Sequence, residues 1–225
     1  YCEGTVLPNW STVTTFTLMA HKNYVIDITN IGSGFSFHGD DTILKASFEN
    51  VHWNDFRGIV WIGLGSLVFT DSWFKNSTIT MHPHTEGDNL IVFMDKCIFE
   101  TTTVTSWASI STVRDSSSVA SSFSFKSSAL FFMGNVINAF SGSVPVLDAA
   151  ISSSLTVTKN LFQNCEIRVT APVKFTTVGV TASSELHNLT FTENTFKNNT
   201  MYNVYNQQSQ KDIPSVSIPL KAKKY

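Results

Sequence analysis

The sequence predicts an all-β fold with one hydrophobic core. Apolar residues make up 42% of the 225 positions and charged residues only 14%, while the chain holds 28 serines, 26 threonines and 18 phenylalanines. Strand-favouring residues are therefore abundant, and no stretch rich in Ala, Leu, Glu and Lys repeats with the period of a helix. The apolar content and the net charge of -2 exclude a disordered chain and a basic nucleic-acid-binding protein.

A repeated pattern organises the chain. Seven segments share the order apolar, any, apolar, any, polar, and the polar positions are Asn30, Asn50, Asp71, Asp95, Gly134, Lys159 and Glu193. Apolar residues two apart predict a short strand with one buried face. The polar pair that follows, as in Lys159-Asn160, suits a tight turn. Residues 106–128 and 171–185 lengthen two of the intervals and are expected to be loop insertions.

The repeats are expected to stack, because one repeat cannot bury its own inner face. Each strand should pair in parallel with its equivalents ~4.8 Å above and below, so that equivalent residues lie over one another. The expected core stack is Phe48, Phe69, Phe93, Phe132, Val157 and Phe191, accompanied by Leu155, Phe162, Leu189 and Phe196. The expected turn ladder is Asn135, Asn160 and Asn194, whose side chains can hydrogen-bond from coil to coil.

Two copies carry a resemblance to a known family. Residues 155–164 (LTVTKNLFQN) and 189–198 (LTFTENTFKN) resemble coils of right-handed parallel β-helix proteins of the pectin-lyase-like superfamily. The resemblance implies a single-stranded right-handed parallel β-helix of about seven coils with two loop insertions, over residues 24–205. Residues 1–23 are then an N-terminal cap or lead-in, and residues 206–225 a C-terminal cap or linker. The Ser/Thr-rich, glycine-poor copies look more like surface proteins or adhesins of this superfamily than like its enzymes.

The sequence offers little for catalysis. Pectin-hydrolysing members typically carry Asn-Thr-Asp, Asp-Asp, Gly-His-Gly and Arg-Ile-Lys in chain order, whereas this chain has only the doublet Asp40-Asp41. The resemblance therefore implies no catalytic residues, and we expect no cofactor. Asp71 and Asp95 are predicted to share one column on adjacent coils, where they could hold a cation or form an acid pair. A solvated corner is the preferred interpretation.

Histidines and cysteines point to no defined metal or disulfide site. The densest potential ligand cluster is His82-Pro-His84-Thr-Glu86-Gly-Asp88, which could bind a divalent metal. It lies in a Pro- and Gly-containing connection, so a solvated loop is preferred and no metal site is predicted. Cys2, Cys97 and Cys165 leave at least one thiol unpaired. Cys97 and Cys165 fall at different corners of different coils and are expected not to be bonded to each other.

Four sequences fit the N-glycosylation acceptor pattern, at Asn9, Asn76, Asn188 and Asn198. Asn76 and Asn198 stand five residues after their reference positions, where a corner should be exposed, and are the preferred acceptors. Unmodified turn asparagines explain the same residues equally well.

The expected function is that of an extracellular or cell-surface structural or adhesive module. It should assemble with itself or with sister domains, because a β-helix ends in unpaired strand edges and these faces carry few charges to hold copies apart. Glycans are a further candidate partner, and nucleic acid is not expected. No run of about 18 apolar residues occurs, so no membrane span is predicted. The alternative is a carbohydrate-active enzyme, tailspike-like or lyase-like, with Asp71 and Asp95 in its groove.

Overall fold

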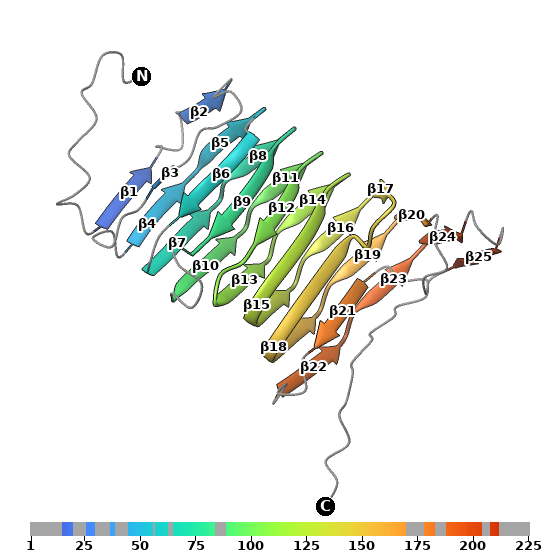
Figure 1. Cartoon of the computed structure of the whole chain (residues 1–225). Helices are drawn as coiled ribbons and strands as arrows, with labels where there is room; N and C mark the ends of the chain where they lie inside the picture. Colours follow the sequence, from blue (N-terminus) through green and yellow to red (C-terminus); the bar gives the residue numbers. More distant parts are fainter. Residues whose placement is uncertain are drawn as a thin grey trace, which may run out of the picture.

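The computed structural model describes residues 15–19, 26–29, 37–38, 45–55, 57–62, 65–83, 89–169, 178–182, 188–203 and 208–211. These residues form short strands joined by tight corners, and no helix occurs among them. Figure 1 shows the strands stacked in chain order from one end of the molecule to the other. Strands of successive coils pair in parallel, so the chain winds through three faces in each coil.

The first face is formed by β1 (Thr15–Met19), β4 (Lys45–Glu49), β7 (Gly65–Thr70), β10 (Leu90–Asp95), β13 (Ile110–Arg114), the second halves of β15 (Ser122–Met133) and β18 (Leu147–Thr158), and β22 (Asn188–Thr192). The second face is an eight-stranded sheet of β2 (Ile26–Thr29), β5 (Val51–Asn54), β8 (Trp73–Lys75), β11 (Ile98–Glu100), β14 (Ser117–Val119), β16 (Val136–Asn138), β19 (Leu161–Gln163) and β23 (Thr195–Lys197).

The third face contains β3 (Phe37–His38), β6 (Arg57–Ile62), β9 (Thr78–His82), β12 (Thr103–Ser106), the first halves of β15 and β18, and β21 (Val178–Ala182). Because β15 and β18 run through both faces, the first and third faces form one 13-stranded sheet. The last coils add a four-stranded sheet of β17 (Ser141–Gly142), β20 (Glu166–Val169), β24 (Thr200–Asn203) and β25 (Gln208–Lys211). In that sheet β25 pairs antiparallel with β24.

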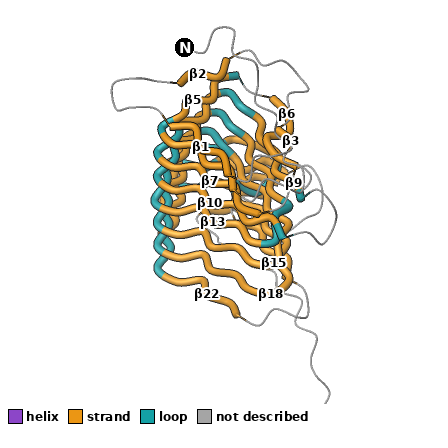
Figure 2. The backbone as a smooth tube through the Cα atoms, turned by 90° about the vertical axis from the view of Figure 1, so that its left-hand side faces the viewer, coloured by secondary structure: helices purple, strands orange, loops and turns teal. Residues whose placement is uncertain are grey.

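Two corners with left-handed backbone flank every strand of the second face from β5 onward. The first corner is Asn50, Asp71, Lys96, Asp115, Gly134, Lys159 or Glu193, and the second, five residues later, is Asp55, Asn76, Thr101, Ala120, Ala139, Asn164 or Asn198. Lys, Thr and Ala are poorly suited to this conformation, which costs about 1 kcal/mol or more for such residues. Backbone hydrogen bonds between coils, such as Asp71 N–H to the Asp95 carbonyl at 3.0 Å, hold the corners in place. Figure 2 shows the corners aligned along the stack.

The register of one coil differs from the expectation. Phe93 does not belong to the core stack, since it faces outward on β10, and Met94 takes the inward position above Phe69. Residues 90–94 are all apolar, so alternation cannot tell which residues point inward. The corner decides, because Lys96 rather than Asp95 adopts the left-handed conformation. The inward column is therefore Phe48, Phe69, Met94, Val113, Phe132, Val157 and Phe191.

Residues 106–128 are a regular coil and not the loop insertion expected from their serine content. They include β13, β14 and the first half of β15. Small residues occupy inward positions here, and the hydroxyls of Ser106, Ser111 and Ser127 form a buried chain at 2.9 and 3.0 Å. Phe123 fills the space left by Ser118 by packing against Phe99 at a ring distance of 5.1 Å. With this coil included, the described residues form eight coils, each of which contributes one strand to the second face.

Strands occur within both expected end segments, 1–23 and 206–225. β1 pairs in parallel with β4, and β25 pairs with β24. Within the other expected insertion, 171–185, β21 continues the third face beside β18. In the last described coil Leu189 is 44% exposed, whereas its equivalent Leu155 is fully buried. The inner side of this coil is therefore less covered than that of the coils before it.

Candidate functional site

The residues after the first corner form a hydrogen-bonded ladder that includes Asn135, Asn160 and Asn194. The Asn160 Oδ1 atom accepts hydrogen bonds from Asn135 N–H at 2.9 Å and from Asn135 Nδ2 at 3.1 Å. Asn160 Nδ2 in turn donates to Asn194 Oδ1 at 2.9 Å and to the Phe132 carbonyl at 2.8 Å. The ladder continues on the other side, where Asn135 Oδ1 accepts from Ser116 N–H at 3.0 Å. These asparagines satisfy buried backbone groups and are structural.

The two described cysteines lie at different corners and are free. Cys97 continues the ladder of the first corner. Its N–H donates to Ser116 Oγ at 3.0 Å, and its thiol donates to the Phe69 and Asp95 carbonyls. Cys165 lies behind the second corner, where its N–H donates to Asn199 Oδ1 at 2.9 Å. Burial raises the pKa of the Cys97 thiol from 9.0 to about 12 and also raises the pKa of Cys165.

Both buried thiols are expected to resist alkylation in the native protein. At pH 8 iodoacetamide should leave Cys97 and Cys165 unmodified, because the folded state keeps them protonated and covered, and denaturant should make both reactive. Because folding raises the pKa of the Cys97 thiol, this group stabilises the folded state at pH values below its ordinary pKa of 9.0. That contribution is lost as the pH rises towards about 12. Peptide mapping by mass spectrometry reads each cysteine separately. Native labelling of either residue at the rate of the denatured chain would contradict its burial.

The carboxylates expected in one column are separated. Asp71 is an exposed corner residue whose equivalent on the next coil is Lys96. Asp95 stands one position earlier, on β10, opposite Arg114 of β13. The Arg114 guanidinium binds both Asp95 carboxylate oxygens at 3.0 Å, which raises the pKa of Arg114, and it also lies 4.9 Å from the Phe93 ring. The predicted pairing of Asp71 with Asp95 in one column is therefore wrong.

The acceptor asparagines of the described residues are accessible. Asn76 and Asn198 occupy equivalent second corners with φ of 49° and 55°, and both side chains are exposed, as is that of Asn188. Asn198 Nδ2 lies 3.5 Å from Asn164 Oδ1, its neighbour in the corner column. Asn9 and the doublet Asp40-Asp41 lie outside the described residues.

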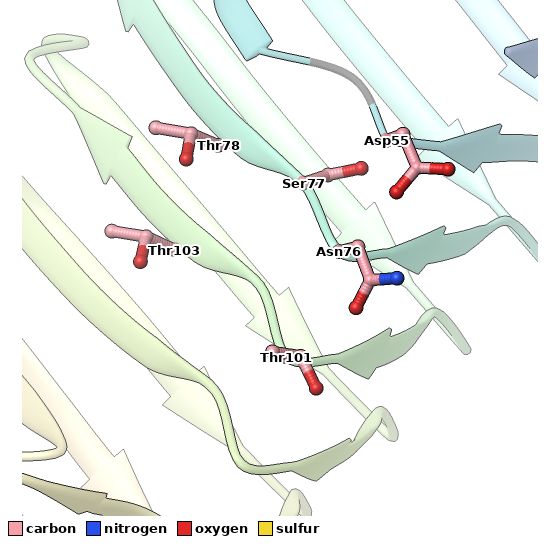
Figure 3. A pocket seen from close by; sticks show the side chains of 6 residues that line it. All are labelled: Asp55, Asn76, Ser77, Thr78, Thr101 and Thr103. Atoms are coloured by element: carbon pink, nitrogen blue, oxygen red, sulfur yellow. The ribbon is translucent and has the colours of Figure 1, made fainter. Parts of the chain in front are cut away.

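An open hollow lies beside Asn76, where the second corner leads into the third face. Figure 3 shows Asp55, Asn76 and Thr101 one above another at the corner, with Ser77, Thr78 and Thr103 on the adjoining backbone. Its lining consists of hydroxyl, amide and carboxylate groups, so it offers hydrogen-bonding groups to a polar ligand. A side-chain pair of acids suitable for hydrolysis is not among these residues.

Hydroxyl groups continue from this hollow across the outer side of the third face. They form two columns, Thr78, Thr103 and Ser122 in the first and Thr80, Thr105 and Ser124 in the second. Inward residues between them, such as Ile79 and Val104, are fully buried, so the columns rest on a rigid sheet. Neighbouring hydroxyls in a column are expected ~4.8 Å apart.

Trp107 stands at the end of these columns and is 46% exposed. Its N–H donates to the Met81 carbonyl at 2.9 Å, which extends β12 by one residue and places the indole beside His82. The two rings are 3.8 Å apart between centroids, and Lys126 Nζ lies 5.7 Å from the indole on the other side. Burial lowers the pKa of His82, so this imidazole is neutral near pH 7. An exposed aromatic ring, a cation and ordered hydroxyls thus share one surface.

The described residues do not test the His82 metal hypothesis. His82 contacts Trp107, and residues 84–88, which hold the rest of the expected ligand cluster, lie outside the described residues. In the described part of the chain no group of three or more His, Cys, Asp or Glu is placed to bind a metal ion. Nor does that part contain a helix long and apolar enough to cross a membrane.

The stacked parallel strands and aligned corners define the chain as a parallel β-helix protein. No protein-family model matches its sequence, and no curated protein or solved structure shows significant similarity to it.

Sequence reasoning did not identify the Trp107 surface. A usable signal was present, because Thr78-Ile-Thr80 and Thr103-Val-Thr105 repeat an outward pair of threonines at the spacing of one coil. The predicted repeat pattern was based only on inward residues and the turn after them. Outward columns became visible once the register of every coil was known.

Proposed function

We propose that this chain is an extracellular or cell-surface structural or adhesive module of the pectin-lyase-like β-helix type, which assembles with itself or with sister domains. One observation carries the proposal: large apolar side chains are exposed on sheet faces whose inward residues fill the core. They are Ile91, Ile98, Val119 and Val136 on strands, with Trp107 directly after β12. Groups of exposed apolar side chains on a folded surface favour a binding role.

For the adhesive contact we propose a glycan at the Trp107 surface. An indole offers a large apolar face for the C–H side of a pyranose ring, and hydroxyl columns beside it can bind sugar hydroxyls. Lys126 adds a positive charge that suits an acidic sugar. The surface is open, and no pair of carboxylates lies beside Trp107 among the residues that the structure describes.

The Trp107→Ala variant is expected to lose this binding while the fold stays intact, because the indole is exposed and its backbone bond is kept. Affinity electrophoresis in gels containing polygalacturonate, hyaluronan or a neutral β-glucan measures the retardation of the wild-type chain and its loss in the variant. Ile91→Ala, which truncates a similarly exposed side chain on the first face, is the matched control and should migrate like the wild type. Equal retardation of wild type and Trp107→Ala would refute the site.

A carbohydrate-active enzyme remains the alternative function. Its proposed groove depended on Asp71 and Asp95 facing each other, and Asp95 instead binds Arg114. Release of reducing ends from any of the three polysaccharides, if it persists in the Trp107→Ala variant, would favour the enzyme over the module. Retardation without release would favour the module.

A further inference from the structure

The outer side of the second face carries an apolar stripe that runs along the stack. It consists of Trp73 on β8, Ile98 on β11, Val119 on β14, Val136 on β16 and Leu161 on β19. Ile98, Val119 and Val136 are 40–45% exposed, and Trp73 and Leu161 are half-buried. Between them, inward residues such as Phe74 and Phe99 fill the core, so the stripe is not needed to stabilise the coil itself.

The stripe is symmetric about β14. Each strand presents two outward residues, which form two columns along the sheet. The first column reads Trp73, Ile98, Ser117, Val136 and Leu161. Two apolar residues therefore stand on each side of a small central serine. A two-fold interface requires such a pattern, because every residue must suit the partner residue at the mirrored position.

A two-fold axis along β14, lying between two facing copies, reverses the order of the strands and keeps each column opposite itself. Ile98 then faces Val136 of the second copy, and Trp73 faces Leu161. Ser117 and Val119 face their own equivalents at the centre. Apolar groups thus meet apolar groups over the whole stripe.

The second column is compatible with the same axis. It reads Lys75, Glu100, Val119, Asn138 and Gln163, so Lys75 faces Gln163 and Glu100 faces Asn138. No like charges oppose each other. An axis along the stack would instead exchange the columns and place Ile98 against Glu100, and an axis along β11 would oppose Glu100 with itself. The pattern therefore selects the axis along β14.

We infer that the second face is a lateral interface between two copies of this chain, packed face to face in reversed strand order about β14. This inference rests on the proposed self-association and names the surface that carries it. The contact of seven strands spans roughly 30 Å by 10 Å, below the size of a standard stable interface, so it is a weak contact that gains strength among many copies on a surface.

The pairing of Ile98 with Val136 of the second copy can be tested by charge complementation. Ile98→Lys and Val136→Glu should each weaken association about tenfold or more, because each places a charge against an apolar group. The double variant should restore it, since the introduced ammonium of one copy then faces the introduced carboxylate of the other. Within one chain these positions lie two strands apart, ~10 Å, with Ser117 between them.

Sedimentation velocity of the full chain over a micromolar to millimolar concentration series measures each association constant. In the double variant, the restored association should weaken as salt is added, because it depends on an ion pair. Association of the wild-type chain should not weaken with salt. Lys126→Glu, a charge change on the third face, is the control and should associate like the wild type. Thermal unfolding checks that each variant is folded.

The two proposals fail in different ways. If the wild-type chain and both single variants associate equally strongly, the proposed lateral interface is wrong and another surface carries the self-association. If the wild-type chain stays monomeric, at 24.9 kDa, at every concentration, both the lateral interface and the proposed self-association are wrong.

Discussion

Phe74→Ala is expected to lower the free energy of unfolding by about 3–5 kcal/mol, which is a large part of the stability of a single domain. Phe74 is fully buried in the middle of the stack. Its ring stacks between Trp53, at a centroid distance of 6.0 Å, and Phe99, at 5.2 Å, and meets the edge of Phe69 at 5.3 Å. Neighbouring coils are held by their own hydrogen bonds and can close the cavity only partly.

Phe93→Ala is the matched control for this prediction. It removes the same side chain from an outward position, where the ring contacts Arg114 and solvent, so we expect a loss of about 1 kcal/mol or less. Urea denaturation of both variants gives the comparison. Equal midpoints would mean that the register of β8 or β10 is wrong.

Asn160→Ala is expected to cost about 2–4 kcal/mol. The substitution leaves Asn135 N–H without its acceptor in a buried corner, and it removes the donor to the Phe132 carbonyl. Asn135 Nδ2 loses one of its two acceptors and keeps the Val113 carbonyl. An unsatisfied buried polar group costs about 1–3 kcal/mol, and this substitution leaves more than one such group without its partner.

Asn138→Ala provides the control for the ladder. Asn138 accepts one exposed hydrogen bond from Asn164 Nδ2 at 2.9 Å, so its loss should cost well under ~1 kcal/mol. Denaturation midpoints and hydrogen exchange at the Asn135 amide separate the two variants. Unchanged protection of that amide in Asn160→Ala would show that the ladder does not hold the corner.

Local spacing in the sequence was enough to predict the fold class and its stacking. Residues 155–164 and 189–198 repeat inward apolar positions two apart, a leucine followed by Val157 or Phe191, and place an asparagine directly after the corner. Both features act locally, because alternation sets the buried face of a strand and the residue after the corner must satisfy backbone groups of the next coil. The coils containing them therefore stack as expected.

Two features of the core depended on the tertiary structure. Residues 90–94 are apolar at every position, so only pairing with β7 and β13 decides that Met94 points inward and Phe93 outward. Residues 106–128 lack large apolar residues at several inward positions, and they form a coil because Phe123 fills the space beside Ser118. Local composition cannot show that a distant ring will occupy a cavity.

The surfaces proposed for binding were also decided by stacking. Trp107 and His82 are separated by 24 residues, and Ile98 and Val136 by 37, yet each pair lies in one outward column. Coil lengths vary from 19 to 34 residues between successive first corners, so a one-residue error in any coil moves a side chain to the opposite side of its sheet. Spacing in the sequence predicts that strands repeat and end in tight corners. The pairing of neighbouring coils decided the corners at Lys96 and Asp115 and which side chains meet outside the core.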